Sequence, residues 1–304
     1  MIKKPNFFII GAPKCGTTSL VRWLELHPNI YISPNKEPRY FDRDLAQRFR
    51  MTEREYLSLF SRAENHHLAI GEATVWYLYS NLAVPTIEKE IGQVRYIVLV
   101  RNPVDMAYSL HEQFFIDQIE PIADFEKAFK ESSNRRVGKN AGRWIREPRL
   151  LDYQAVCNLG SQLERLTQWI PPERLLILLL DDIKKSPRIE YLKVLNFLGL
   201  PDDGLNNFQV FNPAKRVRSA TLQKLIIILR KAELVTRARM GLAPKNSVII
   251  RALNRINKDP RKREPLPAEL RCELELCFES EIKKLGEILK RDLSHWLQNS
   301  RSLL

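Results

Sequence analysis

Short apolar runs alternate with amphipathic stretches along most of this chain. Continuous apolar runs are typical of strands buried on both faces, and they predict strands at 7–10, 30–33, 68–72, 95–101 and 175–180. Apolar residues at helical spacing predict helices at 20–26, 52–62, 103–111, 125–129, 153–169, 191–198, 222–229 and 268–297. This alternation indicates an α/β protein, with a P-loop-type three-layer fold whose central, mostly parallel sheet is flanked by helices.

Positive charge is concentrated in the C-terminal third of the chain. The formal net charge is +13, and residues 213–264 hold fifteen Lys and Arg against three acids. Such a stretch favours an anionic partner (a nucleotide, an acidic polymer or a lipid surface), although a solvated basic helix face has the same composition. We expect one domain over 1–304, whose helical part at about 213–304 packs on the α/β core.

The sequence carries no signal for export or membrane insertion. No apolar run approaches the roughly 18 residues of a membrane span, and Lys3 and Lys4 are followed at once by Pro5 and the first predicted strand. The cysteines have neither metal-ligand nor disulfide spacing: Cys15, Cys157, Cys272 and Cys277. We therefore expect a cytoplasmic location.

The residues after the first predicted strand suit a loop that binds an anion. Gly11 and Gly16 have the spacing of the nucleotide-binding pattern G-x-x-x-x-G-K-[ST], but Thr17 replaces its lysine, and Lys14 lies inside the loop. A helix that begins here would direct free N–H groups and its positive dipole end at the anion. Its first residues are all hydroxyl-bearing: Thr17, Thr18 and Ser19. A plain turn with a solvated Lys14 is the alternative interpretation.

A second loop carries a candidate catalytic carboxylate. Pro34 and Pro38 exclude a long helix here and frame Glu37, which stands beside Lys36 in a rigid charged segment. An ordinary surface loop would show the same pattern.

Two further charged residues end predicted strands. Glu72 ends the strand at 68–72 and Arg101 the strand at 95–101, and open α/β sheets bind ligands beyond the carboxyl ends of their strands. Glu72 could equally cap the next segment. Arg101 suits a bidentate grip on phosphate or sulfate, and Ser109, eight residues later in a helix that Pro103 can begin, can converge on the same anion.

Three motifs are specific in this order: Gly-Ala-Pro-Lys-Cys-Gly-Thr-Thr-Ser, Lys-Glu-Pro-Arg-Tyr-Phe and Val-Arg-Asn-Pro-Val-Asp-Met-Ala-Tyr-Ser. With them the sequence resembles the sulfotransferases that use 3′-phosphoadenosine 5′-phosphosulfate (PAPS), most closely the branch of the heparan sulfate N- and O-sulfotransferases and their bacterial relatives. The likeness continues through Phe-Leu-Gly-Leu at 197–200 to Asp-Leu-Ser-His-Trp at 292–296. It implies transfer of a sulfuryl group from PAPS to a hydroxyl or amine, leaving adenosine 3′,5′-bisphosphate and requiring no metal. A carbohydrate acceptor is favoured, and a lipid or polyketide hydroxyl is the alternative.

The resemblance also implies roles for single residues. The 5′-phosphosulfate would be held by Lys14, Cys15, Gly16, Thr17, Thr18 and Ser19. The 3′-phosphate would be held by Arg101, Ser109 and a basic loop with Lys215, Arg216 and Arg218, in which the glycine usual for the family is absent. Glu37 would be the general base. Acceptor binding is assigned to Lys36, Arg39 and Glu72, although Ala73 replaces the lysine that often follows this acid.

The expected mechanism is in-line attack of the acceptor on sulfur. Glu37 would take the acceptor proton, while Lys14 and the loop N–H groups would stabilise charge on the departing phosphate. The alternative bases are His66, His67 and His111.

Two other classes of protein make different demands on the sequence. A P-loop kinase or triphosphatase would need lysine at position 17 and a magnesium-binding acid at a strand end. A non-catalytic module that binds anionic polymers through 213–264 would not need Lys14, Glu37 and Arg101 around one cleft. Residues 213–264 could also contact a membrane or a carrier protein, and no specific nucleic acid is expected.

Overall fold

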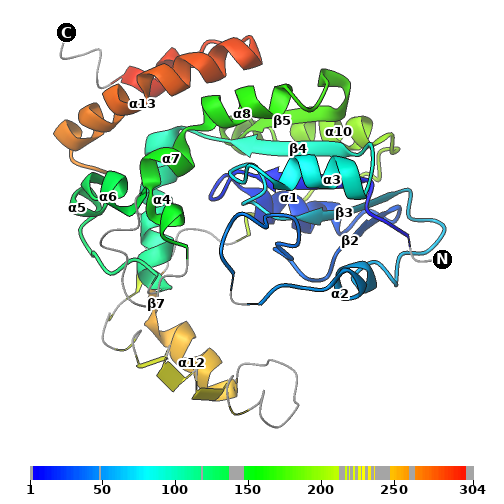
Figure 1. Cartoon of the computed structure of the whole chain (residues 1–304), viewed down its shortest axis with the longest axis horizontal. Coiled ribbons are helices and arrows are strands. Elements are labelled where there is room, and N and C mark those ends of the chain that lie inside the picture. Colours follow the sequence, from blue (N-terminus) through cyan, green and yellow to red (C-terminus); the bar gives the residue numbers. More distant parts are fainter. Residues whose placement is uncertain are drawn as a thin grey trace.

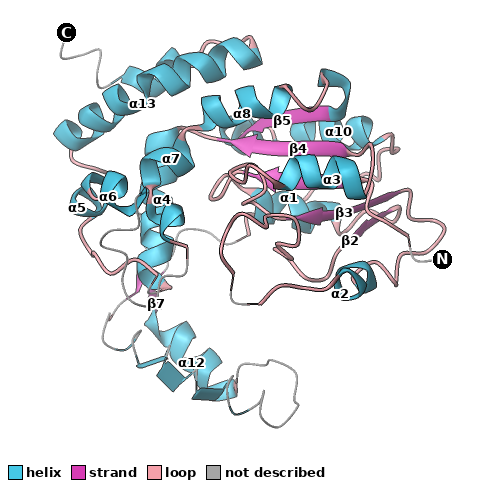
Figure 2. Ribbon diagram, viewed as in Figure 1, coloured by secondary structure: helices cyan, strands magenta, loops and turns pink. Residues whose placement is uncertain are grey.

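A five-stranded parallel sheet forms the centre of the computed structural model (Figures 1 and 2). In spatial order the strands are β2 (Ile30–Ile32), β3 (Ala69–Ala73), β1 (Phe7–Gly11), β4 (Arg95–Val100) and β5 (Leu175–Leu179). The structure describes residues 3–298 except 48, 118, 137–146, 212–215, 218, 220–221, 223–224, 227, 230–231, 234–235, 237–246 and 260–263. Helices flank the sheet, so the predicted α/β fold is confirmed.

The direction of strand addition reverses at β1. Every residue of β1 is buried, with Ile9 opposite Ala73 of β3 and Ile97 of β4. The strands β2 and β3 lie on one side of β1, and β4 and β5 on the other. At such a switch point the loops after neighbouring strands diverge and leave room for a ligand beyond the carboxyl ends. The loop that follows β1 is therefore the first place to look for a site.

The helices between the strands begin and end at recognisable signals. They are α1 (Thr17–Leu24), α2 (Glu53–Ser58), α3 (Ala83–Glu90), α4 (Pro103–Ile116), α5 (Phe125–Lys130), α6 (Ser132–Arg136), α7 (Tyr153–Cys157), α8 (Leu159–Thr167), α9 (Leu180–Lys185) and α10 (Pro187–Leu198), with 3-10 turns η1 (Pro148–Leu151) and η2 (Pro172–Arg174). Asn102 caps α4 by accepting from the N–H of Val104 (2.9 Å), and Pro103 is its first residue, as predicted. Gly199, with φ 73°, ends α10.

The C-terminal part contains β6 (Arg216–Val217), α12 (Val248–Asn257), β7 (Lys258–Asp259), α13 (Ala268–Leu289) and η3 (Ser294–Leu297). The strands β6 and β7 pair antiparallel. The helix α13 lies across α8 and also packs on α4, whereas α12 lies beside β7, away from the sheet (Figure 1). Within the described ranges, no helix combines the length and apolar character needed to cross a bilayer.

The prediction of one helix over 268–297 was wrong at its end. Lys290 takes a left-handed conformation with φ 51°, and the N–H of Arg291 returns to the carbonyl of Gly286 (2.9 Å). The Arg291 carbonyl passes so close to Gly286 that a Cβ there would lie 2.9 Å from it, so glycine permits this reversal. The short turn η3 then buries Trp296, whose indole N–H donates to Asp181 (2.9 Å).

Candidate functional site

The glycine loop (residues 11–16) lies at the carboxyl ends of β1 and β4. The N–H of Ala12 donates to the carbonyl of Leu99 (2.7 Å), and the guanidinium of Arg101 donates to the carbonyl of Lys14 (3.1 Å). Lys14 (φ 64°) and Gly16 (φ 91°) both have a left-handed backbone conformation, which residues other than glycine rarely adopt. The loop is thus held in a tight turn by groups at the end of β4.

The first turn of α1 contains backbone N–H groups that make no hydrogen bond within the described residues. In the described part of the chain, no acceptor takes the backbone N–H groups of Gly16, Thr17 or Thr18. This turn contains no acidic side chain, and Gly16 at the N-cap position has no side chain to cap it. Donors without a protein acceptor and the positive end of the helix dipole together favour an anion here.

Lys14 and Arg101 face the same side of α4. The Lys14 ammonium donates to Oε1 of Gln113 (3.3 Å), and the Arg101 guanidinium lies 3.6 Å from the carboxylate of Asp105. Asp105, Ser109 and Gln113 recur at every fourth position and therefore share one face of the helix. Ser109, which is buried, lies between the contacts of Arg101 and Lys14. The structure thus brings these three predicted phosphate-binding residues together.

Cys15 and Ser19 have internal roles in this structure. Burial raises the pKa of the Cys15 thiol to about 12, so it is a neutral side chain at physiological pH, and it is fully buried. The hydroxyl of Ser19 accepts from the N–H of Phe211 (3.0 Å). Their contact with a nucleotide stays a prediction.

The acid loop (residues 33–47) follows β2 and passes beside the glycine loop. The N–H of Glu37 donates to the carbonyl of Ala73 (3.0 Å), and the Glu37 carboxylate accepts from the N–H of Val75 (3.0 Å). Glu37 (φ 62°) and Arg39 (φ 55°) both have left-handed backbones. Strained backbone of this kind gathers at functional sites in proteins, and here it occurs in both loops.

Lys36 joins the acid loop to the first turn of α1, which follows the glycine loop. Its ammonium donates to the hydroxyl of Thr18 (2.6 Å) and lies 3.8 Å from the carboxylate of Glu37. A candidate base and the anion-binding turn are therefore linked through one side chain.

The Glu37 carboxyl is well placed to accept a proton. Its side chain is 28% exposed, so a small group can reach it. Burial raises its pKa above the usual value, partly offset by Lys36 and by the Val75 N–H. A carboxylate with a raised pKa binds a proton more strongly and is a better general base.

Glu72 lies inside the protein rather than in the cleft. It is fully buried, and its carboxylate accepts from the hydroxyl of Thr74 (3.2 Å). Burial raises its pKa to about 7, an effect reduced by the hydroxyls of Tyr56, Tyr77 and Thr74. Its predicted contact with the acceptor stays a prediction.

Arg39 pairs with the buried carboxylate of Asp42 within the acid loop. The Nε of Arg39 donates to Asp42 (2.7 Å), and Gln47 donates to the other carboxylate oxygen of Asp42 (2.7 Å). Burial raises the pKa of Asp42 to about 6 despite the opposing charge of Arg39. Arg39 thus shapes the loop, and an additional role in acceptor binding stays a prediction.

Aromatic side chains anchor the acid loop to the core. Phe41 is fully buried, with its ring 5.9 Å from that of Phe8 in β1 and 5.1 Å from that of Tyr56 in α2. The hydroxyl of Tyr77 accepts from the N–H groups of Tyr40 (3.0 Å) and Phe41 (3.3 Å). The Tyr-Phe pair that ends the second sequence motif is therefore a structural anchor.

The structure separates the three histidines from the Glu37 carboxylate. His66 and His67 precede β3 and so lie at the amino ends of the strands, the opposite edge of the sheet from the glycine loop. His111 is buried on another face of α4, where its ring contacts the carbonyl of Ile122 (2.9 Å) and burial lowers its pKa. We therefore retain Glu37 as the candidate base.

The predicted basic loop falls largely outside the described residues. This holds for Lys215, Arg218 and the side chain of Arg216. The segment before it runs along α1, where the indole N–H of Trp23 donates to the carbonyl of Gln209 (2.9 Å). Within it, the backbone of Arg216 and Val217 forms β6, which contacts α4, the helix that carries Ser109.

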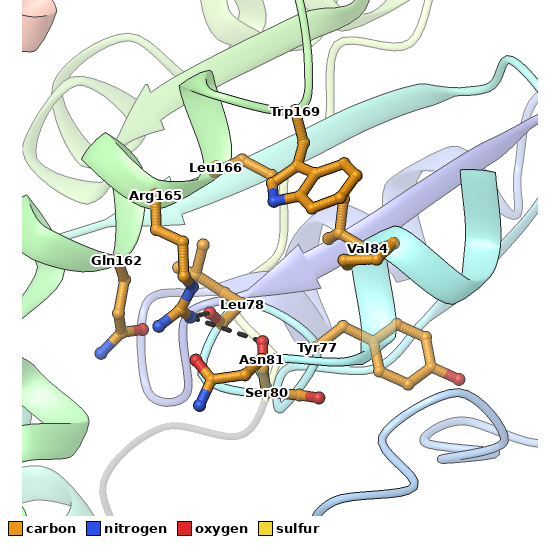
Figure 3. Close-up of a pocket in the computed structure, with 10 residues that line it drawn as sticks. Tyr77, Leu78, Ser80, Asn81, Val84, Gln162, Arg165, Leu166 and Trp169 are labelled. Atoms are coloured by element: carbon orange, nitrogen blue, oxygen red, sulfur yellow. Dashed lines mark hydrogen bonds between the residues drawn. The ribbon is translucent and has the colours of Figure 1, made fainter. Parts of the chain in front are cut away.

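A small cleft between α3 and α8 borders the turn that follows β3 (Figure 3). From α8, Arg165 donates to the carbonyls of Leu78 (2.6 Å), Tyr79 (3.3 Å) and Ser80 (3.4 Å). The N–H of Leu78 in turn donates to the carbonyl of Ile10 (2.8 Å). Arg165 therefore holds the turn at 78–80, which follows Val75, the residue whose N–H donates to Glu37.

Sequence reasoning missed Gln113 and Arg165. A signal existed for Gln113, because it follows Ser109 by one helical turn and shares its face. Arg165 gave no local signal, since its partners belong to a turn 85 to 87 residues away.

Similar proteins of known family support an interpretation of this site. A family model described as the sulfotransferase domain matches residues 4–225. Carbohydrate sulfotransferase 15 of Mus musculus is 27% identical over 246 residues, which is 64% of this chain and 44% of that protein. Heparan sulfate glucosamine 3-O-sulfotransferase 3B1 of Homo sapiens is 26% identical over 215 residues, 69% of this chain and 50% of that protein. The chain thus spans half or less of the length of these relatives.

A solved structure matches over nearly the whole chain. It is a sulfotransferase from Alicyclobacillus acidocaldarius, 25% identical, with a TM-score of 0.71 over 97% of this chain and 99% of that one.

Proposed function

Because this chain belongs to the sulfotransferase family, we propose that it is an enzyme that moves the sulfuryl group of PAPS to a hydroxyl or amine of an acceptor. A carbohydrate is the favoured acceptor, because the names of two relatives specify carbohydrate and heparan sulfate substrates. Transfer to a lipid or polyketide hydroxyl is the alternative within the same chemistry.

The groups at the glycine loop fit the sulfated end of such a donor. The unused N–H groups of Gly16, Thr17 and Thr18, together with the Lys14 ammonium, supply donors to one anionic group. Arg101 and Ser109, and by prediction Lys215, Arg216 and Arg218, would hold the 3′-phosphate. Thr17 in place of the nucleotide-binding lysine, and an arginine rather than an acid at the end of β4, argue against magnesium-ATP.

Different residues would accept the acceptor's proton and stabilise the charge on the departing phosphate. When bound, the donor supplies a sulfuryl group whose S–O bond to the 5′-phosphate breaks as an acceptor oxygen or nitrogen bonds to sulfur. Glu37 takes the proton that the acceptor loses. Lys14 and the N–H groups of the first turn of α1 stabilise the negative charge that remains on the phosphate. Lys36 holds the acid loop, with Glu37, beside the first turn of α1.

The observation that carries this proposal is the contact from Lys36 to Thr18 (2.6 Å) beside Glu37. It links a carboxylate of raised pKa to an anion-binding turn, which a binding module without chemistry would not require. A single domain over 1–304, a cytoplasmic location, independence from metal and a contact of 213–264 with a membrane or carrier protein remain predictions.

Thermal unfolding with two nucleotides tests the donor site. We expect adenosine 3′,5′-bisphosphate, without metal, to stabilise the protein by about 2.7 kcal/mol at a hundredfold excess over its Kd, and ATP to have little effect. Stronger stabilisation by ATP would contradict the proposal and favour a kinase or triphosphatase.

Radiolabelled PAPS with glycan, lipid and phenolic acceptors then tests the reaction. Label on a glycan supports the favoured acceptor, and label on a lipid or phenol supports the alternative. Tight nucleotide binding without transfer to any acceptor would indicate a binding module.

A further inference from the structure

The C-terminal part exposes aliphatic side chains within the most basic stretch of the chain. We define the apolar patch by six of them, with their exposed fractions: Leu225 49%, Ile228 62%, Leu229 39%, Val248 71%, Ile249 68% and Ile256 61%. Isolated exposed aliphatic residues are ordinary on protein surfaces, whereas a group of them marks a place of contact.

The exposed residues of α12 share one side of that helix. Successive helical residues are about 100° apart, so positions 248, 249, 252 and 256 fall within one sector of about 100°. All four are apolar and exposed. Ile250 and Asn257 point the other way and are buried. The sequence of α12 also contains Arg251 and Arg255.

The helical residues around 225 repeat this arrangement. Positions 225, 228, 229 and 232 fall within one sector of about 100°, and all four are apolar and exposed. Ile226 is buried there, and neither Ile226 nor Ile250 belongs to the main core cluster among the described residues. The two segments are joined by reciprocal hydrogen bonds between Ser219 and Asn257 (2.9 and 3.1 Å). Each segment therefore combines one buried aliphatic side chain with an exposed apolar face.

We propose that the apolar patch docks this protein on the surface of an anionic lipid bilayer. Helices that lie in a membrane interface combine an aliphatic face with flanking Lys and Arg, because the aliphatic groups enter the acyl boundary while the cations meet anionic headgroups. Residues 213–264 supply fifteen Lys and Arg against three acids. The helix α12 itself lies away from the sheet (Figure 1).

Other binding partners would account for either the cations or the exposed aliphatic side chains, but not for both. An anionic polysaccharide would use the cations but gives aliphatic side chains nothing to bury against. A second copy would bury the apolar patch but would bring two strongly positive surfaces together, which is repulsive. Since β6 contacts α4, docking would hold the candidate site close to the lipid surface. This inference concerns location and does not depend on the proposed reaction.

Sedimentation of the full chain with vesicles tests the proposal. We expect binding to vesicles of phosphatidylcholine with 30% phosphatidylglycerol, little binding to phosphatidylcholine alone, and loss of binding as NaCl rises from about 0.1 to 1 M. The double variant Ile249→Asp/Ile256→Asp should lower the partition coefficient about tenfold or more.

Two matched controls separate apolar insertion from charge and from misfolding. Ile249→Leu/Ile256→Leu should bind as the parent does, and so should Leu26→Asp/Leu68→Asp, whose residues are 62% and 60% exposed elsewhere on the molecule. A urea-unfolding midpoint close to that of the parent in every variant reports an intact fold. Three results would overturn the proposal: equal binding to both vesicle types, full binding by the Asp variant at Ile249 and Ile256, or dimers in size-exclusion chromatography that this variant abolishes.

Discussion

The glycine loop and the acid loop meet at one site, but they are held by different kinds of contact. The glycine loop relies on the main chain, with Ala12 bonded to Leu99 and a guanidinium on the carbonyl of Lys14. The acid loop is held largely by side chains from distant segments. Ser80 bonds to Asp44, the carboxylate of Glu147 accepts from the N–H of Ala46 (2.7 Å), and Arg149 donates to the carbonyl of Asp44.

This difference suits the two loops to different tasks, anion binding and proton transfer. A loop shaped by its backbone keeps its N–H groups aimed at an anion and carries few groups that titrate near neutral pH. A loop held by buried carboxylates adjusts the proton affinity of its acids, and burial raises the pKa of Glu37, Asp42 and, behind them, Glu72. We expect changes in the glycine loop to alter donor binding, and changes in the acid loop to alter turnover and pH dependence.

Glu37→Gln gives the strongest test of this division. It should lower kcat by roughly a hundred- to ten-thousandfold, because the acceptor proton loses its base, and leave the Kd of adenosine 3′,5′-bisphosphate unchanged. In the parent enzyme kcat/KM should fall as pH decreases through the raised pKa of Glu37, since the carboxylate must be ionised. Near-normal turnover in the variant would remove Glu37 from the mechanism.

Lys14→Met should affect both steps. We expect kcat to fall about a hundred- to a thousandfold through loss of charge stabilisation, together with weaker bisphosphate binding by calorimetry. Lys89→Met, in the exposed part of α3, is the matched control and should behave as the parent does. An effect on turnover with fully retained nucleotide affinity would contradict a role in holding the donor.

Glu72→Gln should change the pH dependence of the free energy of unfolding. The pKa of Glu72 is about 7 in the folded protein against 4.5 ordinarily, so its contribution to stability is present below about pH 4.5 and is lost as pH rises through 7. The variant lacks this titration. Its stability relative to the parent should improve by up to about 3 kcal/mol between pH 5 and 8.5, measured by urea unfolding. A difference that does not change with pH would show that Glu72 titrates normally.

Gln113→Leu should have the smallest effect. Oε1 of Gln113 accepts from Lys14, and its Nε2 donates to Asp117 (2.7 Å), so the amide is oriented toward the ammonium. Loss of one such bond costs roughly 0.5–1.5 kcal/mol, which predicts a two- to tenfold decrease in kcat. Gln113→Glu, which would pair with Lys14 as an ion, should slow turnover further. Equal kcat for the parent and both variants would leave Gln113 without a positioning role.

Local patterns in the sequence identified much of the fold and of the glycine loop. The buried run of β1, the spacing of Gly11 and Gly16, and Pro103 as the first residue of α4 each act through near neighbours in the chain. Backbone sterics and hydrogen bonding within a few residues decide such features, so they can be read without a structure. The end of α13 was missed because Lys290, which is not a glycine, takes the left-handed conformation there and brings the carbonyl of Arg291 back to Gly286.

The acid side of the site was decided by the tertiary structure. Lys36 bonds to Thr18 across 18 residues, Arg165 to Leu78 across 87, and Lys14 to Gln113 across 99. These contacts depend on the order β2-β3-β1-β4-β5 and on its register, which bring distant segments to one edge of the sheet. The sequence by itself determined which residues could bind an anion or take a proton. The burial of the acids and their position beside the anion-binding turn arise only when the sheet assembles. Their proton affinity follows from that burial, because the pKa of a carboxyl depends on its surroundings as well as on its chemistry.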